Sequence, residues 1–445
     1  MTMPADPTTL LRSRGYLGLL VVAAVLGVPI SAAAYGFLAL VSYLQKELFT
    51  HLPHGLGFQT EPIWWPLPIL AIGGVLVALT IRYLPGQGGP SPAYGFKLHA
   101  PPTPAELPWV ILAALATLAF GVVLGPEMPL ILLGGGLAVL AMRLARRDVP
   151  DRARAVVASA GSFAAISTLL GSPLAGAFLM MEASGLGGPM LGLVLVPGLL
   201  AAGVGTLVFI GLDAWTGLGT FSLAIPGLPP FGRPDVAEFG WALVIGVAAA
   251  LIGSAIGRLG LLLHSYADRW TLVVTPLAGL AVAGLAIGYA EGTGKPSSEV
   301  LFSGQTALPP LVQHAASYTV GALVLLVVCK GLAYSLSLCS FRGGPTFPAM
   351  FIGAAGGIAL SHLPGLPMIA GAAIGIGAMT AGMLQLPMTA VLITTLFLGT
   401  DGIKVIPLVI VAVVVAFVIS KWLAGPPTAP QVPEPAEAAV PPQVR

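Results

Sequence analysis

Residues 125–129 (GPEMP) place one acidic side chain between two prolines in an otherwise apolar stretch. Proline is favoured in the first turn of a helix, where its missing N–H would have no partner within the helix. A Gly-Pro pair between two apolar runs therefore predicts a helix that begins at this point. The free amides and the positive dipole end of such a helix attract anions, and Glu127 lies in the same first turn.

An ionisable side chain in an apolar segment indicates a functional site. The ionised carboxylate of Glu127 would occupy the anion position at the helix N-terminus and close a path through it. When protonated or displaced, the side chain would vacate that position, which would link anion movement to proton movement. The simpler alternative is that Glu127 only complements the dipole of its own helix.

The second half of the chain repeats this pattern at residues 344–348 (GPTFP). In both halves four residues follow the motif, and then a glycine and two small residues. A second match lies downstream, where residues 173–177 (PLAGA) correspond to residues 387–391 (PMTAV). Two matches in the same order favour an internal duplication, and duplicated halves with broken helices are typical of secondary transporters. Two converging helix starts would hold a partly dehydrated anion without a fixed positive side chain, which favours its release.

Composition places these elements in a membrane. Apolar residues make up 56% of the 445 residues and charged residues 8%, whereas a soluble domain carries roughly 25% charged residues. At about 20 residues per crossing, the apolar runs supply about ten or more membrane segments. The first run, residues 15–44, is too long for the apolar core of a signal peptide. The formal net charge of +2 is too small to indicate a nucleic-acid partner.

The basic residues set the expected orientation. Arg12 and Arg14 precede the first apolar run, and a second basic cluster lies in residues 143–154. The positive-inside rule places both on the cytoplasmic side of the plasma (inner) membrane, in a multi-pass protein. We expect five parts, which are a cytoplasmic N-terminus at 1–14, a first membrane repeat at 15–220, a connecting loop at 221–239, a second membrane repeat at 240–424 and a disordered Pro/Ala-rich tail at 425–445.

These segments resemble the CLC family of chloride channels and proton–chloride antiporters. The family builds its anion path from three segments of the types G-S-G-I-P, G-R/K-E-G-P and G-x-F-x-P, with a gating glutamate in the second. Residues 125–129 match the second segment, which places Glu127 at the gating glutamate. Residues 343–348 (GGPTFP) resemble the third, with Phe347 one place late, and residues 88–92 (GGPSP) approximate the first. The resemblance covers roughly residues 15–424 in consistent order.

The resemblance implies an all-α polytopic membrane protein of two inverted-topology repeats, whose broken helices meet at the bilayer midplane. It also implies a homodimer with one path per subunit. The expected activity is transport of a small inorganic anion, above all chloride, with protons as the candidate coupled ion and without a cofactor or an enzymatic step. The implied anion-binding residues are Pro90, Ser91, Gly125, Pro126, Met128, Gly344, Thr346 and Phe347.

Two of the three anion-binding segments depart from the family pattern. The serine of the family's first segment, whose hydroxyl holds the anion, falls on Pro90 or Ser91 here, and only Ser91 can donate a hydrogen bond. Pro345 in the third segment lacks a backbone N–H that the family directs at the anion. Selectivity for chloride over other anions is therefore not fixed by the resemblance.

The groups that the family uses on the inner side are also replaced. The family places a tyrosine in its last membrane helix, but no tyrosine follows Tyr334 in this chain. The inner glutamate of proton-coupled members is missing as well, and Asp213 is its near neighbour. Glu182 is the other candidate for a proton path, with hydrogen bonding at a helix end as its structural alternative. We therefore expect weak or absent proton coupling.

Two alternative functions remain at this stage. One is secondary transport of a different substrate on the same scaffold, which the departures at Pro90 and Pro345 and the missing tyrosine favour. The other is an intramembrane enzyme. That would require a nucleophile–base pair, an acidic metal cluster or a phosphate-binding signature, and the sequence contains none that we recognise.

Overall fold

The computed structural model describes residues 13–145, 150–185, 188–217, 225, 227, 231–399 and 402–425. Within these ranges the secondary structure is helical, apart from a single β-bridge between Gly125 and Gly344. Nine of the described helices are long and apolar enough to cross a membrane, and four further apolar helices have 10–17 residues. The apolar runs therefore correspond to nine full-length helices and a set of shorter ones.

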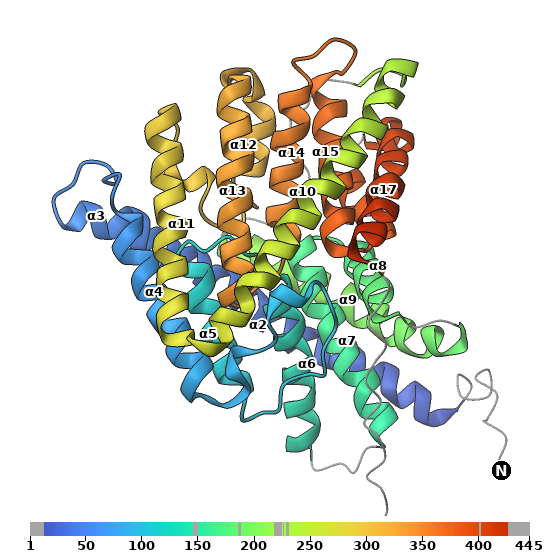
Figure 1. Cartoon of the computed structure of the whole chain (residues 1–445). Coiled ribbons are helices and arrows are strands. Elements are labelled where there is room, and N and C mark those ends of the chain that lie inside the picture. The colour runs from blue at the N-terminus through green and yellow to red at the C-terminus, as the bar shows by residue number, and fades with distance from the viewer. Residues whose placement is uncertain are drawn as a thin grey trace, which may run out of the picture.

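The helices fall into two series along the chain (Figure 1). The first series is α2 (Arg14–Lys46), α4 (Pro66–Tyr83), α5 (Leu107–Ala119), α6 (Glu127–Leu144), α7 (Asp151–Leu170), α8 (Pro173–Ser184) and α9 (Gly188–Thr216). The second is α10 (Val236–Arg269), α11 (Thr271–Thr293), α13 (Val320–Ser340), α14 (Thr346–Leu360), α15 (Met368–Leu384), α16 (Pro387–Phe397) and α17 (Gly402–Ala424). Short helices connect them, including α3 (Leu52–Gly55), α12 (Leu308–Gln313) and the 3-10 turns η2 (Pro85–Gly88), η3 (Pro92–Tyr94) and η4 (Ser297–Glu299).

The two series repeat the same packing. In the first, α2 runs parallel to α9, with Gly27 against Ala201 and Ser31 against Gly205. In the second, α10 runs parallel to α17, because Gly246 lies against Ala412 and the Arg258 guanidinium donates to the Leu423 carbonyl. Glycines also let α6 approach α7 and let α14 approach α15, as small residues do between membrane helices.

The repeats are inverted relative to each other. Helices α4 and α11 hold the same place in the two series and pack antiparallel, with Gly74 against Pro276 and Gly279 against Leu70. Equivalent helices of opposite direction are what inverted-topology repeats require. The predicted fold class, an all-α protein of two inverted repeats with broken helices, is therefore confirmed.

Two long apolar runs are each divided into two helices. Residues 155–182 divide into α7 and α8 at Gly171, and residues 368–399 divide into α15 and α16 at Gln385. Both residues are left-handed, with φ of 58° and 60°, which stops an α-helix. The next helices begin at Pro173 and Pro387, the residues that the internal repeat paired.

The structure describes only some of the expected boundaries between the five parts of the chain. Helix α10 begins at Val236, inside the connecting loop expected at 221–239, most of which lies outside the described residues. The tail from residue 426 and the N-terminal residues 1–12 also lie outside them.

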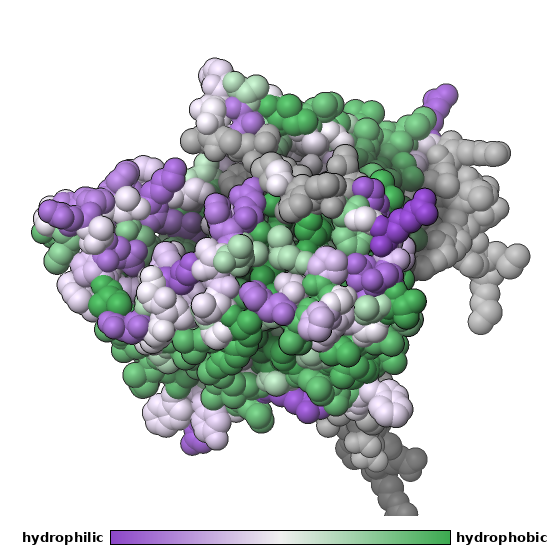
Figure 2. Space-filling model, turned by 90° about the horizontal axis from the view of Figure 1, so that it is seen from above, coloured by the Kyte–Doolittle hydropathy of each residue, from purple (hydrophilic) through white to green (hydrophobic). Residues whose placement is uncertain are grey.

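The centre of the molecule is formed by the two helices that follow the motifs, α6 and α14, together with α15. Helices α14 and α15 are buried over almost their whole length, as is the first half of α6. The outer helices expose large apolar side chains, among them Val21, Leu207 and Leu262. Seen from above, the molecule has hydrophilic side chains across the face toward the viewer and hydrophobic side chains along its flank (Figure 2). An apolar flank around a buried centre is the surface that a bilayer covers.

Candidate anion site between the two repeats

Helices α6 and α14 begin against each other. The amide of Gly125 donates to the carbonyl of Gly344 at 2.7 Å, and the amide of Gly344 donates to the carbonyl of Gly125 at 2.6 Å. This pair of bonds is the isolated antiparallel bridge of the fold. The two G-P-x-x-P segments, more than 200 residues apart in the sequence, thus bring their helix N-termini to one place, as the sequence predicted.

The other predicted residues of these motifs occupy the first turns. Pro126 and Pro345 are the N-caps of α6 and α14, and the residues of both first turns are buried. Met128 is the second residue of α6, and Thr346 and Phe347 are the first two residues of α14. Each proline stands where the helix would leave an amide unpaired, which explains why both helices start at these positions.

Glu127 reaches from its own helix to the other repeat. It is the first residue of α6 and its side chain is fully buried. Its Oε1 accepts a hydrogen bond from the Phe347 amide at 3.0 Å. The backbone and the side chain of Thr346 lie beside the same carboxylate. The carboxylate therefore lies at the N-terminus of α14, and a role confined to the dipole of α6 does not account for its position.

The carboxylate of Glu127 fills space that two glycines leave open. A Cβ built on Gly344 or on Gly125 would overlap the Glu127 carboxylate. Any side chain at these positions would push the carboxylate away from the α14 amides. The glycines of the two motifs are thus required by the position of Glu127 as well as by the close approach of the two backbones.

Tyr334 on α13 fixes the start of α14. Its side chain is fully buried, and its hydroxyl donates to the Pro345 carbonyl at 2.8 Å. Sequence reasoning did not assign a role to this tyrosine. A polar residue in a mid-membrane helix was the only available signal, and it does not identify a partner.

Two buried cations lie on the approach to α14 and bond to backbone carbonyls. The Lys330 ammonium donates to the carbonyls of four successive residues, 299–302, at 2.8, 3.0, 3.1 and 3.3 Å, and lies 4.5 Å from the centre of the Phe351 ring. Arg342 donates from Nη1 to the Phe341 carbonyl at 3.2 Å. The hydrogen bond that Glu127 accepts comes from an uncharged amide.

Residues 88–92, which resemble the first segment of the family's anion path, lie against the other two segments. Gly89 packs against Leu132 of α6, and Gly88 packs against Arg342. Ser91 caps η3, and its hydroxyl accepts from the Ala93 amide at 3.4 Å. The binding of an anion by Pro90 or Ser91 stays a prediction.

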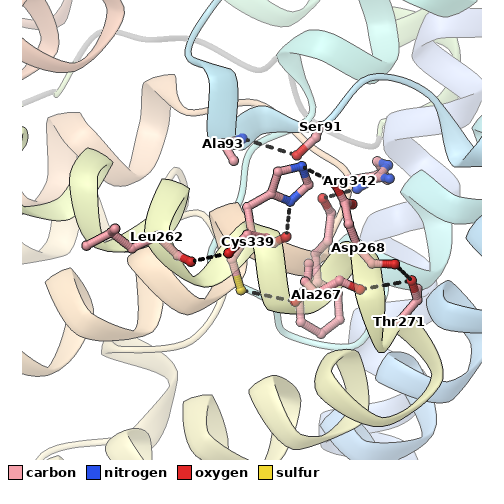
Figure 3. A network of polar contacts seen from close by, with 12 residues as sticks. Ser91, Ala93, Leu262, Ala267, Asp268, Thr271, Cys339 and Arg342 are labelled. Carbon is pink, nitrogen blue, oxygen red and sulfur yellow. Dashed lines mark hydrogen bonds and ion pairs between the residues drawn. The ribbon is translucent and has the colours of Figure 1, made fainter.

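A polar network joins this segment to α10 and α13 (Figure 3). Tyr94 of η3 packs edge-on against the His264 ring, with 5.1 Å between the ring centres. His264 bonds to the Cys339 carbonyl at 2.7 Å and pairs with Asp268 at 3.3 Å. The network anchors η3 beside the end of α13, immediately before the third segment.

The two candidates for a proton path lie away from this cluster. The carboxylate of Glu182, near the end of α8, accepts from the Met388 amide at 3.0 Å and from the Thr389 amide and hydroxyl at 2.8 and 2.7 Å. These bonds give it a structural role at the start of α16. Asp213 lies in the last turn of α9, with Oδ1 buried and without a partner among the described residues. A proton path through these groups stays a prediction.

The sequence matches a known protein family over most of its length. The family described as voltage gated chloride channel matches residues 70–421. The chain belongs to this family, the CLC family. Among curated CLC-like relatives, the putative ion-transport protein YfeO of Escherichia coli O1:K1 is 31% identical over 366 residues, which are 80% of this chain and 82% of that protein. The Salmonella choleraesuis protein of the same description is 33% identical over 367 residues, 80% of this chain and 84% of that protein.

Solved structures share the CLC fold with this chain. A slow cyanobacterial Cl⁻/H⁺ antiporter is similar with a TM-score of 0.74 and 21% identity, over 92% of this chain and 95% of the other. A CLC-type fluoride/proton antiporter is similar with a TM-score of 0.67 and 20% identity, over 92% and 96% of the two chains. At these identities the likeness shows the fold alone.

Proposed function

We propose that this protein transports a small inorganic anion, above all chloride, through a path that Glu127 closes. The observation that carries the proposal is the hydrogen bond from the Phe347 amide to the Glu127 carboxylate. A carboxylate from one repeat occupies the N-terminus of a helix from the other repeat, where helix amides bind anions. The carboxylate thus stands where a transported anion would bind.

The charge balance of this site suits an ion that must bind and then leave. Each helix N-terminus carries roughly half an elementary positive charge, and the N-termini of α6 and α14 meet here. The ammonium of Lys330 is directed to backbone carbonyls. Partial charges of this kind favour binding, yet they hold a dehydrated ion less tightly than a buried ammonium would.

The gate in this proposal is the position of the Glu127 side chain. While the carboxylate accepts from Phe347, an anion is excluded from the same amide by charge and by volume. Protonation or rotation of the side chain frees the amide, and the hydroxyl of Thr346 is a second donor beside it. The Cl⁻/H⁺ and fluoride/proton antiporters that share the fold support a halide as the ion.

The helix directions support an orientation in the plasma membrane. Helix α11 follows α10 after a single residue and runs antiparallel to α4, while α17 runs parallel to α10. The ends of α4, α10 and α17 therefore share one side, and they carry Arg82, Arg269 and Lys421. The positive-inside rule makes this side cytoplasmic. Assembly as a homodimer is part of the same proposal, on the resemblance to the family alone.

Crystals soaked in bromide test the site itself. Bromide scatters anomalously and substitutes for chloride, so its position is measured without a transport assay. We expect Glu127→Ala to show bromide within hydrogen-bond reach of the Phe347 amide. A matched Glu61→Ala variant, changed in the loop before α4, should leave the Phe347 amide occupied by the Glu127 carboxylate. Bromide elsewhere in the Glu127→Ala protein, with the α14 amides empty, would contradict the proposal.

A further inference from the structure

A groove of about 610 Å³ lies between α10, α11 and α13. These three helices pack next to one another in the second repeat (Figure 1). The groove is lined by leucine, alanine and glycine residues and by one cysteine, Cys329. None of the described lining residues belongs to a G-P-x-x-P motif, so the groove is separate from the candidate anion site.

Two glycines of α11 leave part of this groove open. A Cβ built on Gly284 or Gly288 would meet no neighbouring atom of the described residues within 4 Å. A Cβ built on Gly279 of the same helix would overlap the carbonyl of Leu70 on α4. Small residues in membrane helices usually allow the close approach of another helix, as Gly279 does. Gly284 and Gly288 face no such helix, so the space beside them is free for another molecule.

Helix contacts close the groove at both ends. At one end Gly292 of α11 packs against Leu325 of α13, and at the other Gly260 of α10 packs against Leu338 of α13. The lining residues of α13 extend from Leu325 to Leu336, which is about 16 Å along the helix. The hydrocarbon core of a bilayer is about 30 Å thick. The groove therefore covers about half of this thickness.

The groove opens sideways toward the bilayer. Ala281, Gly284 and Leu332 line the groove and are exposed at the surface of the protein. They belong to the middle parts of α11 and α13, which are both long and apolar enough to cross a membrane. A lipid-facing surface at this depth meets hydrocarbon and no water. The open side of the groove is therefore in contact with lipid tails.

The chemistry of the lining selects a hydrocarbon ligand. The described lining residues offer no charged side chain, and their one polar side chain is the Cys329 thiol, a weak hydrogen-bond donor. A lipid headgroup or an inorganic anion would find no partner here. The volume of about 610 Å³ lies within the roughly 300–1,000 Å³ that is typical of ligand pockets.

The length of the groove separates a lipid tail from a protein helix. A spanning helix of another subunit packs along the whole hydrocarbon core of about 30 Å, but the contacts at Gly292 and Gly260 close the groove at about half of this length. An acyl chain belongs to one leaflet, and one leaflet supplies half of the core. The dimensions therefore favour a single acyl chain over a second copy of the chain.

We propose that this groove is a binding site for one acyl chain of a membrane phospholipid, whose far end lies between Gly284 and Leu332. The chain packs on one face of α13. Tyr334 lies five residues after Cys329 and thus on the opposite side of this helix, where its hydroxyl donates to the Pro345 carbonyl. The acyl chain thus supports α13 without contact with the anion site. The proposal does not depend on anion transport.

Photolabelling of the purified protein in detergent micelles locates the chain. The probe is a phosphatidylethanolamine that carries a diazirine near the end of one acyl chain, and mass spectrometry identifies the labelled residues. We expect the labels to concentrate on the groove faces of α11 and α13, and an excess of unlabelled phosphatidylethanolamine should displace them. The same phospholipid with its diazirine next to the glycerol should label the helix ends instead, because the groove lies in the middle of the membrane.

A variant that fills the groove supplies the matched comparison. Gly284→Leu places a side chain in the open space without a clash, so most of the groove labelling should be lost. Gly36→Leu makes the same change at an exposed glycine of α2, where the added Cβ also meets nothing within 4 Å, and should leave the groove labelling unchanged. Gly288→Leu repeats the test if Gly284→Leu does not fold.

Labels that spread evenly over the lipid-facing helices would overturn the site and indicate a general lipid annulus only. Groove labelling that persists in Gly284→Leu, or that unlabelled phosphatidylethanolamine does not displace, would overturn it as well. A groove that takes no label at all would do the same, because detergent or a second copy of the chain would then fill it.

Discussion

Gly125 and Gly344 donate to each other's carbonyls at 2.7 and 2.6 Å. The residue before the N-cap of α6 is therefore bound to the residue before the N-cap of α14, across the boundary of the two repeats. This contact fixes the distance between two helix N-termini, and the Glu127 carboxylate lies in the space beside it. An added side chain at either glycine would overlap the Glu127 carboxylate, which is the proposed gate.

Gly344→Ala should open the path. Its Cβ would overlap the Glu127 carboxylate, so the carboxylate must leave the Phe347 amide and anion flux should rise severalfold. Gly356→Ala, on the same helix α14, is the matched control, because nothing lies within 4 Å of its added Cβ. It should leave flux unchanged and stabilise the helix by up to about 1 kcal/mol. Flux from proteoliposomes and thermal unfolding in detergent measure both. Equal flux in the two variants would show that Glu127 does not obstruct an anion.

Lys330→Met should destabilise the protein. The ammonium satisfies the carbonyls of residues 299–302, and buried carbonyls without partners cost about 1–3 kcal/mol each. Because the segment can relax, we expect a total loss of about 2–4 kcal/mol in the free energy of unfolding. Lys97→Met, at an exposed lysine, should stay within about 0.5 kcal/mol of the wild type. Denaturant unfolding in detergent compares the two, and equal losses would remove Lys330 from the supports of α13 and α14.

Glu61 should make stability depend on pH. Burial raises the pKa of this carboxyl, in the loop before α4, from 4.5 to about 7, against a smaller opposing effect of the Ser297 hydroxyl. The folded protein thus holds a proton that the unfolded chain has released, so the free energy of unfolding falls as the pH rises from 4.5 to about 7. Glu61→Gln has no such group.

The Glu61→Gln variant should therefore be more stable than the wild type at about pH 8, and the difference should vanish below the ordinary carboxyl pKa of about 4.3. Thermal unfolding at a series of pH values measures this. Parallel curves for the two proteins over the whole range would mean that Glu61 keeps an ordinary pKa.

The sequence predicted the centre of the site because the residues that form it lie within two short motifs. The two G-P-x-x-P motifs specify where α6 and α14 begin, and Glu127 lies within the first of them. The bond to the Phe347 amide follows once the two helix starts converge. The duplication indicated that convergence, and the β-bridge between Gly125 and Gly344 shows it.

The supporting contacts could not be predicted in the same way. Lys330 bonds to residues 28–31 positions earlier, and Arg258 reaches a carbonyl 165 positions away. No periodicity or motif records such pairs, because they depend on how α11, α13 and α17 pack. The helix breaks at Gly171 and Gln385 could have been predicted from the sequence, because a proline follows each break by two residues.

Proton coupling should be weak or absent. The inner glutamate of proton-coupled members is missing, and the Glu182 carboxylate is bonded to the start of α16. Asp213 keeps one unpartnered oxygen, yet no described chain of polar groups links it to Glu127. An outward chloride gradient should therefore fail to drive uphill proton movement in proteoliposomes. Pumping at a fixed ratio would contradict this, and loss of that pumping in Asp213→Asn or Glu182→Gln would identify the group.

The central claim is that the ionised Glu127 closes an anion path. The most direct measurement is the initial rate of chloride efflux from proteoliposomes, from about pH 4.5 to about pH 8. A carboxyl group titrates in this range whether its pKa is ordinary or raised by burial. Wild-type flux should rise as the pH falls. Glu127→Gln keeps the shape without the charge, so its flux should be higher at the alkaline end and should not vary with pH, whereas Glu61→Gln should behave as the wild type. Flux in Glu127→Gln with the wild-type rate and the wild-type pH dependence would contradict the account.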